Sequence, residues 1–88
     1  MRALAAVIAA CALSACQAAP HEYPASAAAQ FHRTCPANDG VCVCTWDQIT
    51  RNMTYEEYSA ALTRFRREGL MDPKITHARA HCLEHKSS

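Results

Sequence analysis

The residues of this chain that are best suited to chemistry are its cysteines and histidines. Six cysteines occur in 88 residues, and Cys42 and Cys44 form a C-x-C pair. Cys35 precedes this pair, and Cys82 follows it at a long distance along the chain. Thiolates that lie close together can bind soft metals such as Cu(I) or Zn(II). In an oxidising compartment the same residues form disulfide bonds.

Three histidines, His77, His81 and His85, recur at every fourth position near the end of the chain. In a helix this spacing places the imidazoles on one face, which is the arrangement of a helical His pair in a metal site. None of the three is followed directly by a glutamate, as in the H-E-x-x-H motif. Solvated polar positions, two of them near a helix C-terminus, are the explanation that we favour. We therefore expect no metal or other cofactor, with a periplasmic metal site at these histidines as the alternative.

The start of the chain has the composition of an export signal. Arg2 supplies a positive charge, and residues 3–13 (ALAAVIAACAL) form an uncharged apolar run. This run is much shorter than the roughly 20 residues that a membrane-spanning helix needs. Ser14 and Ala15 are small, and Cys16 follows them.

The stretch Leu13-Ser14-Ala15-Cys16 resembles the lipobox of bacterial lipoproteins, in which a leucine, two small residues and an invariant cysteine follow the apolar run. The resemblance covers only the first 16 residues. It implies that a signal peptide of residues 1–15, including Cys11, is removed and that Cys16 carries lipid. Several acyl chains together make a stable membrane anchor. The alternative is an ordinary secretory signal that is cut between Ala15 and Ala19.

The same resemblance implies a location and a set of partners. We expect a protein of the bacterial cell envelope that is lipid-anchored and faces the periplasm. Gln17 replaces the aspartate that retains lipoproteins at the inner membrane, which implies the outer membrane. Lys and Arg number 9 and Asp and Glu 8, so removal of Arg2 leaves a balanced chain. Nucleic-acid binding needs a clustered positive excess; the expected partners are therefore the membrane and an unidentified envelope protein.

Residues 16–34 are rich in alanine, contain Pro20 and Pro24, and show no helical or strand periodicity. This composition is typical of a flexible tether between a lipid anchor and a folded domain. The run Ser26 to Gln30 could form a nascent helix, but it is too short to be stable alone. Residues 35–88 are expected to form the folded domain.

Within this domain the sequence predicts a small all-α fold of three helices, over residues 41–52, 55–68 and 73–85. Either Asp39 or Thr45 could cap the first helix. Thr54 with Glu57 forms a capping box for the second, and Gly69 is suited to end it. Asp72 with Pro73 marks the start of the third. The predicted buried positions of the three helices are Cys42, Trp46, Ile49, Met53, Tyr55, Tyr58, Leu62, Phe65, Ile75, Ala78 and Cys82.

The four cysteines of the domain are expected to form two disulfide bonds, because a core this small needs covalent support. If Cys42 is helical, it shares a stripe with Trp46 and is expected to pair with Cys82. Cys44 would then pair with Cys35. If residues 42–44 are extended, the reverse pairing becomes possible, with Cys35 bonded to Cys42 and Cys44 bonded to Cys82. The first pairing is the one that we prefer.

The expected function is non-enzymatic. No Ser, His and Asp set, phosphate-binding glycine loop or free nucleophilic thiol is recognisable. The aromatic residues have the helical spacing of a core, so they are interpreted as packing residues. The sequence therefore favours a protein-binding or structural accessory module of the cell envelope.

Overall fold

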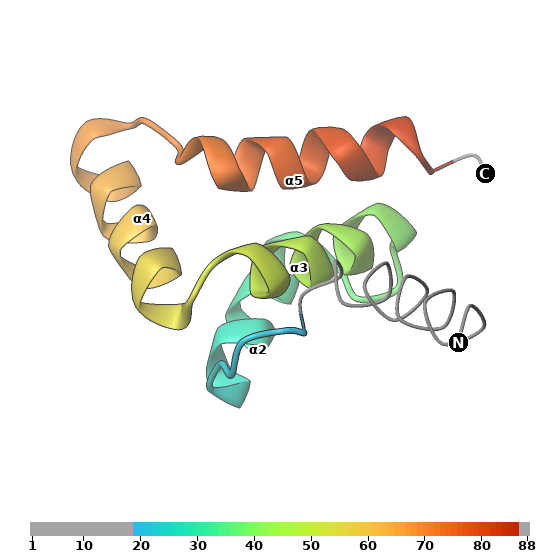
Figure 1. Ribbon diagram of the computed structural model, residues 1–88, viewed down its shortest axis with the longest axis horizontal. Helices are drawn as coiled ribbons and strands as arrows, with labels where there is room; N and C mark the ends of the chain where they lie inside the picture. Colours follow the sequence, from blue (N-terminus) through green and yellow to red (C-terminus); the bar gives the residue numbers. More distant parts are fainter. Residues whose placement is uncertain (1–18, 87–88) are drawn as a thin grey trace, which may run out of the picture.

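The computed structural model describes residues 19–86, and this part of the chain is entirely helical or irregular (Figure 1). Its helices are α2 (Ala25–Thr34), α3 (Gly40–Asn52), α4 (Tyr55–Glu68) and α5 (Pro73–Glu84). The predicted all-α class with two disulfide bonds is confirmed, although the described part has four helices where three were predicted. The predicted signal peptide, the lipidated Cys16, and residues 87 and 88 lie outside the described residues.

Helix α3 begins where an aspartate satisfies the exposed N–H groups of its first turn. The Asp39 carboxylate accepts hydrogen bonds from the backbone N–H groups of Val41, at 2.8 Å, and Cys42, at 3.3 Å. Capping of this kind contributes about 1 kcal/mol to a helix. Of the two predicted caps, Asp39 is therefore the one that is used, and Cys42 lies inside the helix.

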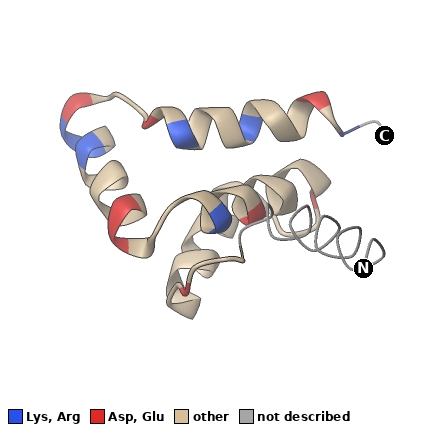
Figure 2. Cartoon of the chain, in the orientation of Figure 1, with Lys and Arg blue, Asp and Glu red and all other residues tan. Residues whose placement is uncertain are grey.

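Helix α4 begins and ends as the sequence predicts. The Thr54 side chain accepts from the Glu57 N–H at 3.1 Å, and Glu57 accepts from the Thr54 N–H at 2.8 Å. That backbone hydrogen bond, followed by the nearby charge of Lys74, lowers the pKa of the Glu57 carboxyl. Gly69 ends the helix in the left-handed region, with φ of 76°. Glu56 and Glu57 lie in the first turn of α4, and Arg66 and Arg67 lie in its last turn, which suits the helix dipole, whereas Glu68 at the end of the helix does not (Figure 2).

One carboxylate connects α4 to α5. The Asp72 side chain accepts from the Lys74 N–H at 2.8 Å and so caps α5, with Pro73 in the first turn. Its other oxygen accepts from the Arg64 guanidinium at 3.0 Å. These two contacts fix the α4–α5 corner, after which α5 returns alongside α3 (Figure 1).

The core lies where α3, α4 and α5 meet, and it consists of Ile49, Met53, Tyr58, Ala61 and Ala78. Of the predicted inward positions of α3 and α5, Ile49, Met53 and Ala78 belong to this cluster, and Trp46 and Ile75 pack against it. On α4 the prediction is wrong for one residue, because Phe65 is 42% exposed. Helix α4 contacts the core through Tyr58 and Ala61, and its last turn extends beyond that contact.

The predicted flexible tether is wrong for the residues that the structure describes. Residues 25–34 form helix α2, which buries Ala27. Phe31 of α2 stacks on Trp46 of α3, with ring centroids 4.9 Å apart. A helix this short is marginal in water, so packing against α3 is what stabilises it.

The segment before α2 is also held against the domain. The Tyr23 ring makes edge or tilted contacts with Trp46, Tyr55 and Tyr58, at centroid distances of 5.3–5.7 Å. Its hydroxyl donates to the carbonyl oxygens of Met53, at 2.9 Å, and Thr54, at 3.2 Å. These oxygens belong to the α3–α4 junction. Tyr23 therefore binds the N-terminal segment to the turn between two helices.

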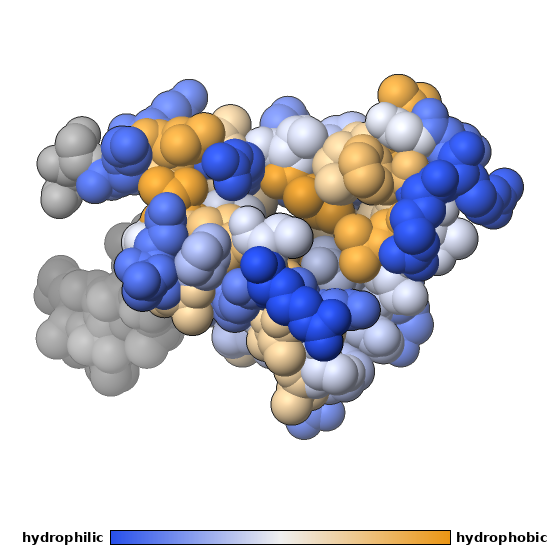
Figure 3. Space-filling model, turned by 180° about the vertical axis from the view of Figure 1, so that it is seen from behind, coloured by the Kyte–Doolittle hydropathy of each residue, from blue (hydrophilic) through white to orange (hydrophobic). Residues whose placement is uncertain are grey.

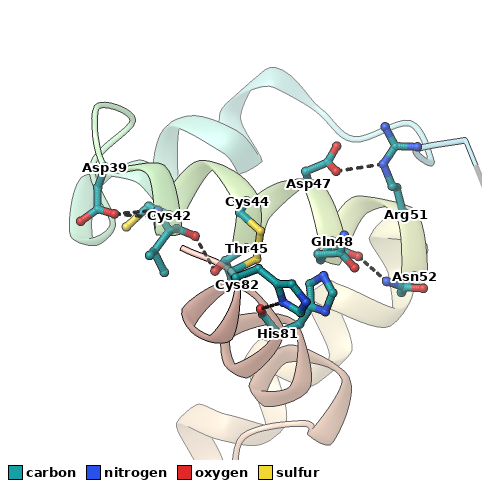
Figure 4. The surroundings of a disulfide bond; sticks show 12 residues. Asp39, Cys42, Cys44, Thr45, Asp47, Gln48, Arg51, Asn52, His81 and Cys82 are labelled. Atoms are coloured by element: carbon teal, nitrogen blue, oxygen red, sulfur yellow. Dashed lines mark hydrogen bonds and ion pairs between the residues drawn. A yellow bond between two sulfur atoms is a disulfide. The ribbon is translucent and has the colours of Figure 1, made fainter. Parts of the chain in front are cut away.

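The disulfide bonds are Cys35–Cys42 and Cys44–Cys82, so the preferred pairing is wrong and the alternative pairing is the one formed. The helical stripe of Cys42 and Trp46 faces α2 and Tyr23, because α2 covers the side of α3 that was expected to face α5. Cys35 follows α2 directly and so meets Cys42. Cys44 lies about 200° further round the helix and reaches Cys82 on α5 (Figure 4).

The two bridges are expected to differ in their contribution to stability. On the chain-entropy account, loss of Cys44–Cys82, which spans 38 residues, costs about 4 kcal/mol of unfolding free energy. Loss of Cys35–Cys42, which spans 7 residues, costs about 2 kcal/mol. Urea denaturation, followed by Trp46 fluorescence, measures the two losses of unfolding free energy. One double variant is Cys44→Ser with Cys82→Ser, and the other is Cys35→Ser with Cys42→Ser. Equal losses, or a larger loss from the second pair, would contradict the expectation.

Ionisation of Tyr23 is expected to destabilise the domain. Burial, with smaller contributions from Tyr58, Glu57 and Glu56, raises the pKa of Tyr23 to about 12. A tyrosine in the unfolded chain ionises near pH 10. The stability that buried, neutral Tyr23 gives the folded domain is therefore complete below pH 10 and is lost as the pH rises through 12. Tyr23→Phe is expected to lower the free energy of unfolding by about 1 kcal/mol at pH 7. It is also expected to make the fall of this free energy between pH 10 and 12 less steep.

Urea denaturation at a series of pH values tests this. Tyr55→Phe is the matched control, because the Tyr55 hydroxyl makes no hydrogen bond within residues 19–86. A Tyr23→Phe protein whose stability falls as steeply as that of the wild type above pH 10 would refute the assignment to Tyr23.

Candidate functional site

Two of the hollows that border α5 differ in chemistry. The first, which we call the polar groove, runs between α3 and α5 and has a volume of about 450 Å³. Its lining residues are Gln48, Asn52, Lys74, His77, Ala78 and His81. Several of its polar groups already have partners in the chain. The side-chain amide of Asn52 donates to the backbone carbonyl of Gln48 at 2.8 Å, and the Lys74 ammonium lies 3.6 Å from the Glu57 carboxylate.

The three predicted metal ligands do not gather at one point. His77 and His81 line the polar groove, whereas His85, one turn beyond His81 at the C-terminal end of α5, lines a separate hollow beside the Cys44–Cys82 bridge. The His81 and His85 rings are 4.3 Å apart, and the His85 ring N–H donates to the His81 carbonyl at 2.7 Å. Figure 4 shows His81 beside the bridge. Within residues 19–86 no three His, Cys, Asp or Glu side chains are grouped closely enough to hold a metal ion.

The second hollow, which we call the apolar cleft, lies between α2 and the α4–α5 corner. It has two adjoining lobes of about 290 and 370 Å³, which share Phe31, Thr34, Met71 and Ile75. The remaining lining residues are Gln30, Ile49, Tyr58, Leu62 and Arg66 in one lobe, and Cys35, Thr45, Thr76 and Arg79 in the other. Apolar side chains gather between α5 and α2, near this corner, on the face shown in Figure 3.

The walls of the cleft come from distant parts of the sequence. Helix α2 supplies Phe31, which also stacks on Trp46. The corner supplies Met71, whose position depends on the Asp72 cap and the ion pair of that carboxylate with Arg64. The cleft therefore exists only when α2 is folded and the corner is fixed.

The side chains of the cleft suit binding rather than bond making. Neither lobe is lined by an acidic residue or a histidine, and Cys35 is held in a disulfide bond. A hollow with apolar walls and a few polar groups at its edge is the usual form of a binding site. Tyr58 is buried at its floor, and that burial raises the pKa of its hydroxyl, with a smaller effect of Tyr55.

Sequence reasoning missed this cleft. Phe31 and Thr34 were assigned to the tether, and Met71 to the connection between two helices. The available signal was the pair Trp46 and Phe31, since a second large aromatic residue beside an alanine run indicates a packed helix rather than a linker. The assignment of Tyr58 and Leu62 to the core is correct, but both also border the cleft.

Comparison of the chain with protein-family models, with curated proteins and with solved structures found no match. Within residues 19–86, no helix has the length and apolar character needed to cross a membrane.

Zinc binding is expected to be weak. Because the three imidazoles do not converge, calorimetric titration with Zn(II) should detect no site tighter than about 10 μM. Ni(II) and Cu(II) are titrated in parallel. Submicromolar zinc binding that disappears in His77→Ala with His81→Ala would overturn this expectation and would establish the metal-site alternative.

Proposed function

We propose that this chain is a small lipid-anchored protein of the bacterial cell envelope that binds another protein and catalyses no reaction. The anchor is Cys16, in the lipobox-like stretch Leu13-Ser14-Ala15-Cys16. The folded part faces the periplasm, at the outer membrane. An oxidising periplasm accords with the two disulfide bonds of the domain.

The observation that carries the binding function is the apolar cleft. Phe31, Met71 and Ile75 are only partly buried, and they border a hollow that no other part of residues 19–86 fills. Nearby, Phe65 in the last turn of α4 is 42% exposed, and Leu70, which follows Gly69, is 66% exposed. Grouped apolar side chains of this kind mark interaction sites on small proteins.

Lipid attachment predicts a covalent label. The protein is expected to incorporate radiolabelled palmitate when it is expressed in a Gram-negative host and to fractionate with membranes. Cys16→Ser is expected to lose both the label and the membrane association, whereas Cys11→Ser is expected to retain them. An unlabelled wild-type protein in the soluble periplasmic fraction would support the ordinary secretory signal instead.

A protein partner predicts contact at one face of α5 only. The photo-crosslinking residue p-benzoylphenylalanine in place of Thr76, which lines the apolar cleft, is expected to give a discrete adduct in intact cells. Thr34, across the cleft on α2, is expected to give the same adduct. Mass spectrometry of the adduct identifies the partner.

His77 provides the matched control, because it is the neighbour of Thr76 in sequence but lines the polar groove. A crosslinker at this position is expected to give no such adduct. Adducts of equal yield at Thr76 and His77, or none at Thr76 and Thr34, would exclude the apolar cleft as the binding face.

A further inference from the structure

The charges at the edge of the apolar cleft are all of one sign. Arg66 borders one lobe and Arg79 the other, and both side chains are exposed. The residues that line the two lobes include no aspartate or glutamate. The whole chain is nearly neutral, with 9 basic and 8 acidic residues. A positive edge on a nearly neutral protein is therefore a local property of the cleft.

These two arginines, like Arg33, Arg67 and Lys86, make no ion pair within residues 19–86. Within residues 19–86, the ion pairs are Arg51 with Asp47, Arg64 with Asp72, and Lys74 with Glu57. The only side-chain bond of Arg66 in this part of the chain is a weak one, at 3.4 Å, to the Thr63 hydroxyl. Arg79 makes no ion pair within these residues. Both guanidinium groups are thus available to an acidic ligand.

The positions of the two arginines indicate how the negative charges of a ligand must be arranged. The lobes share a central wall of Phe31, Met71 and Ile75, and each lobe adds one arginine of its own. An occupant of both lobes would place apolar groups at the centre and meet a positive charge in each lobe. A fatty acid has one charged end, whereas an amphipathic helix can carry acidic residues on both sides of an apolar face.

We propose that the apolar cleft binds an amphipathic helical segment of a partner protein whose apolar face is flanked by acidic residues. This proposal rests on the protein-binding function proposed above and specifies the chemistry of the partner. Apolar anchors of the segment pack on Phe31, Met71 and Ile75, and its carboxylates pair with Arg66 and Arg79. Guanidinium groups suit this role because they bind carboxylates through two parallel hydrogen bonds.

The test is a selection from a random peptide display library against the processed full chain in nanodiscs, with empty nanodiscs as the counter-selection. Enriched peptides are expected to show apolar residues at i, i+3 and i+4 spacing with Asp or Glu on both flanks. Synthetic versions without tryptophan are titrated by the fluorescence of Trp46, the only tryptophan of the chain, which stacks on the cleft residue Phe31.

Charge reversal then separates the cleft arginines from general electrostatics. Arg66→Glu with Arg79→Glu is expected to weaken binding at least tenfold, and Arg67→Glu, an exposed arginine outside the cleft, to change it less than twofold. Circular dichroism checks that the variants remain folded. Affinities that are unchanged by the double reversal would overturn the proposal.

The remaining outcomes distinguish the two proposals. Peptides that bind the cleft but have neutral or basic flanks would overturn the acidic-helix proposal and leave the binding function in place. Failure to enrich any peptide would count against both. Displacement of enriched acidic peptides by oleate in the wild type, with oleate binding tighter than every peptide, would assign the cleft to lipids and overturn the helix proposal.

Discussion

The fold depends on the covalent bond between Cys44 and Cys82. Helices α3 and α5 are distant in sequence and make the most extensive helix contact in the described part of the chain, and the bridge joins them through a buried cysteine. A core of five buried side chains, two of which are alanines, contributes only about 3–5 kcal/mol net. Helix α4 is the connection between these two helices, so its orientation follows from theirs. The same bond therefore holds both hollows in shape.

The local chemistry of helix ends was predictable, because each capping signal acts over three or four residues. Thr54 with Glu57, Gly69, and Asp72 with Pro73 all have the predicted roles. What the sequence could not show is the arrangement of α2, which depends on Phe31 against Trp46 and on Tyr23 against the α3–α4 junction. These contacts join residues that are 15 to 31 positions apart and leave no local pattern.

The error in the cysteine pairing followed from the missing helix. Cys42 was expected to pair with Cys82 of α5, because α5 was the only expected neighbour for the stripe that Cys42 shares with Trp46. Once α2 occupies that side, Cys35 is the nearer partner, with its Cα 5.3 Å from that of Cys42. The candidate site was missed for the same reason, since one wall of the apolar cleft belongs to α2. On the other wall, Tyr58, Leu62 and Ile75 were predicted as inward-facing residues, but Met71 was assigned to a connection between helices.

The contacts of the N-terminal segment limit the distance between the folded domain and a lipid anchor at Cys16. The His21 N–H donates to the Thr50 carbonyl at 2.8 Å, and Tyr23 follows two residues later. Between Cys16 and His21 the chain spans at most roughly 18 Å even when fully extended. If Cys16 carries the lipid, as we propose, the domain cannot extend far from the membrane into the periplasm. It is instead confined to a thin layer at the bilayer surface, and it meets only those partners that come to that membrane.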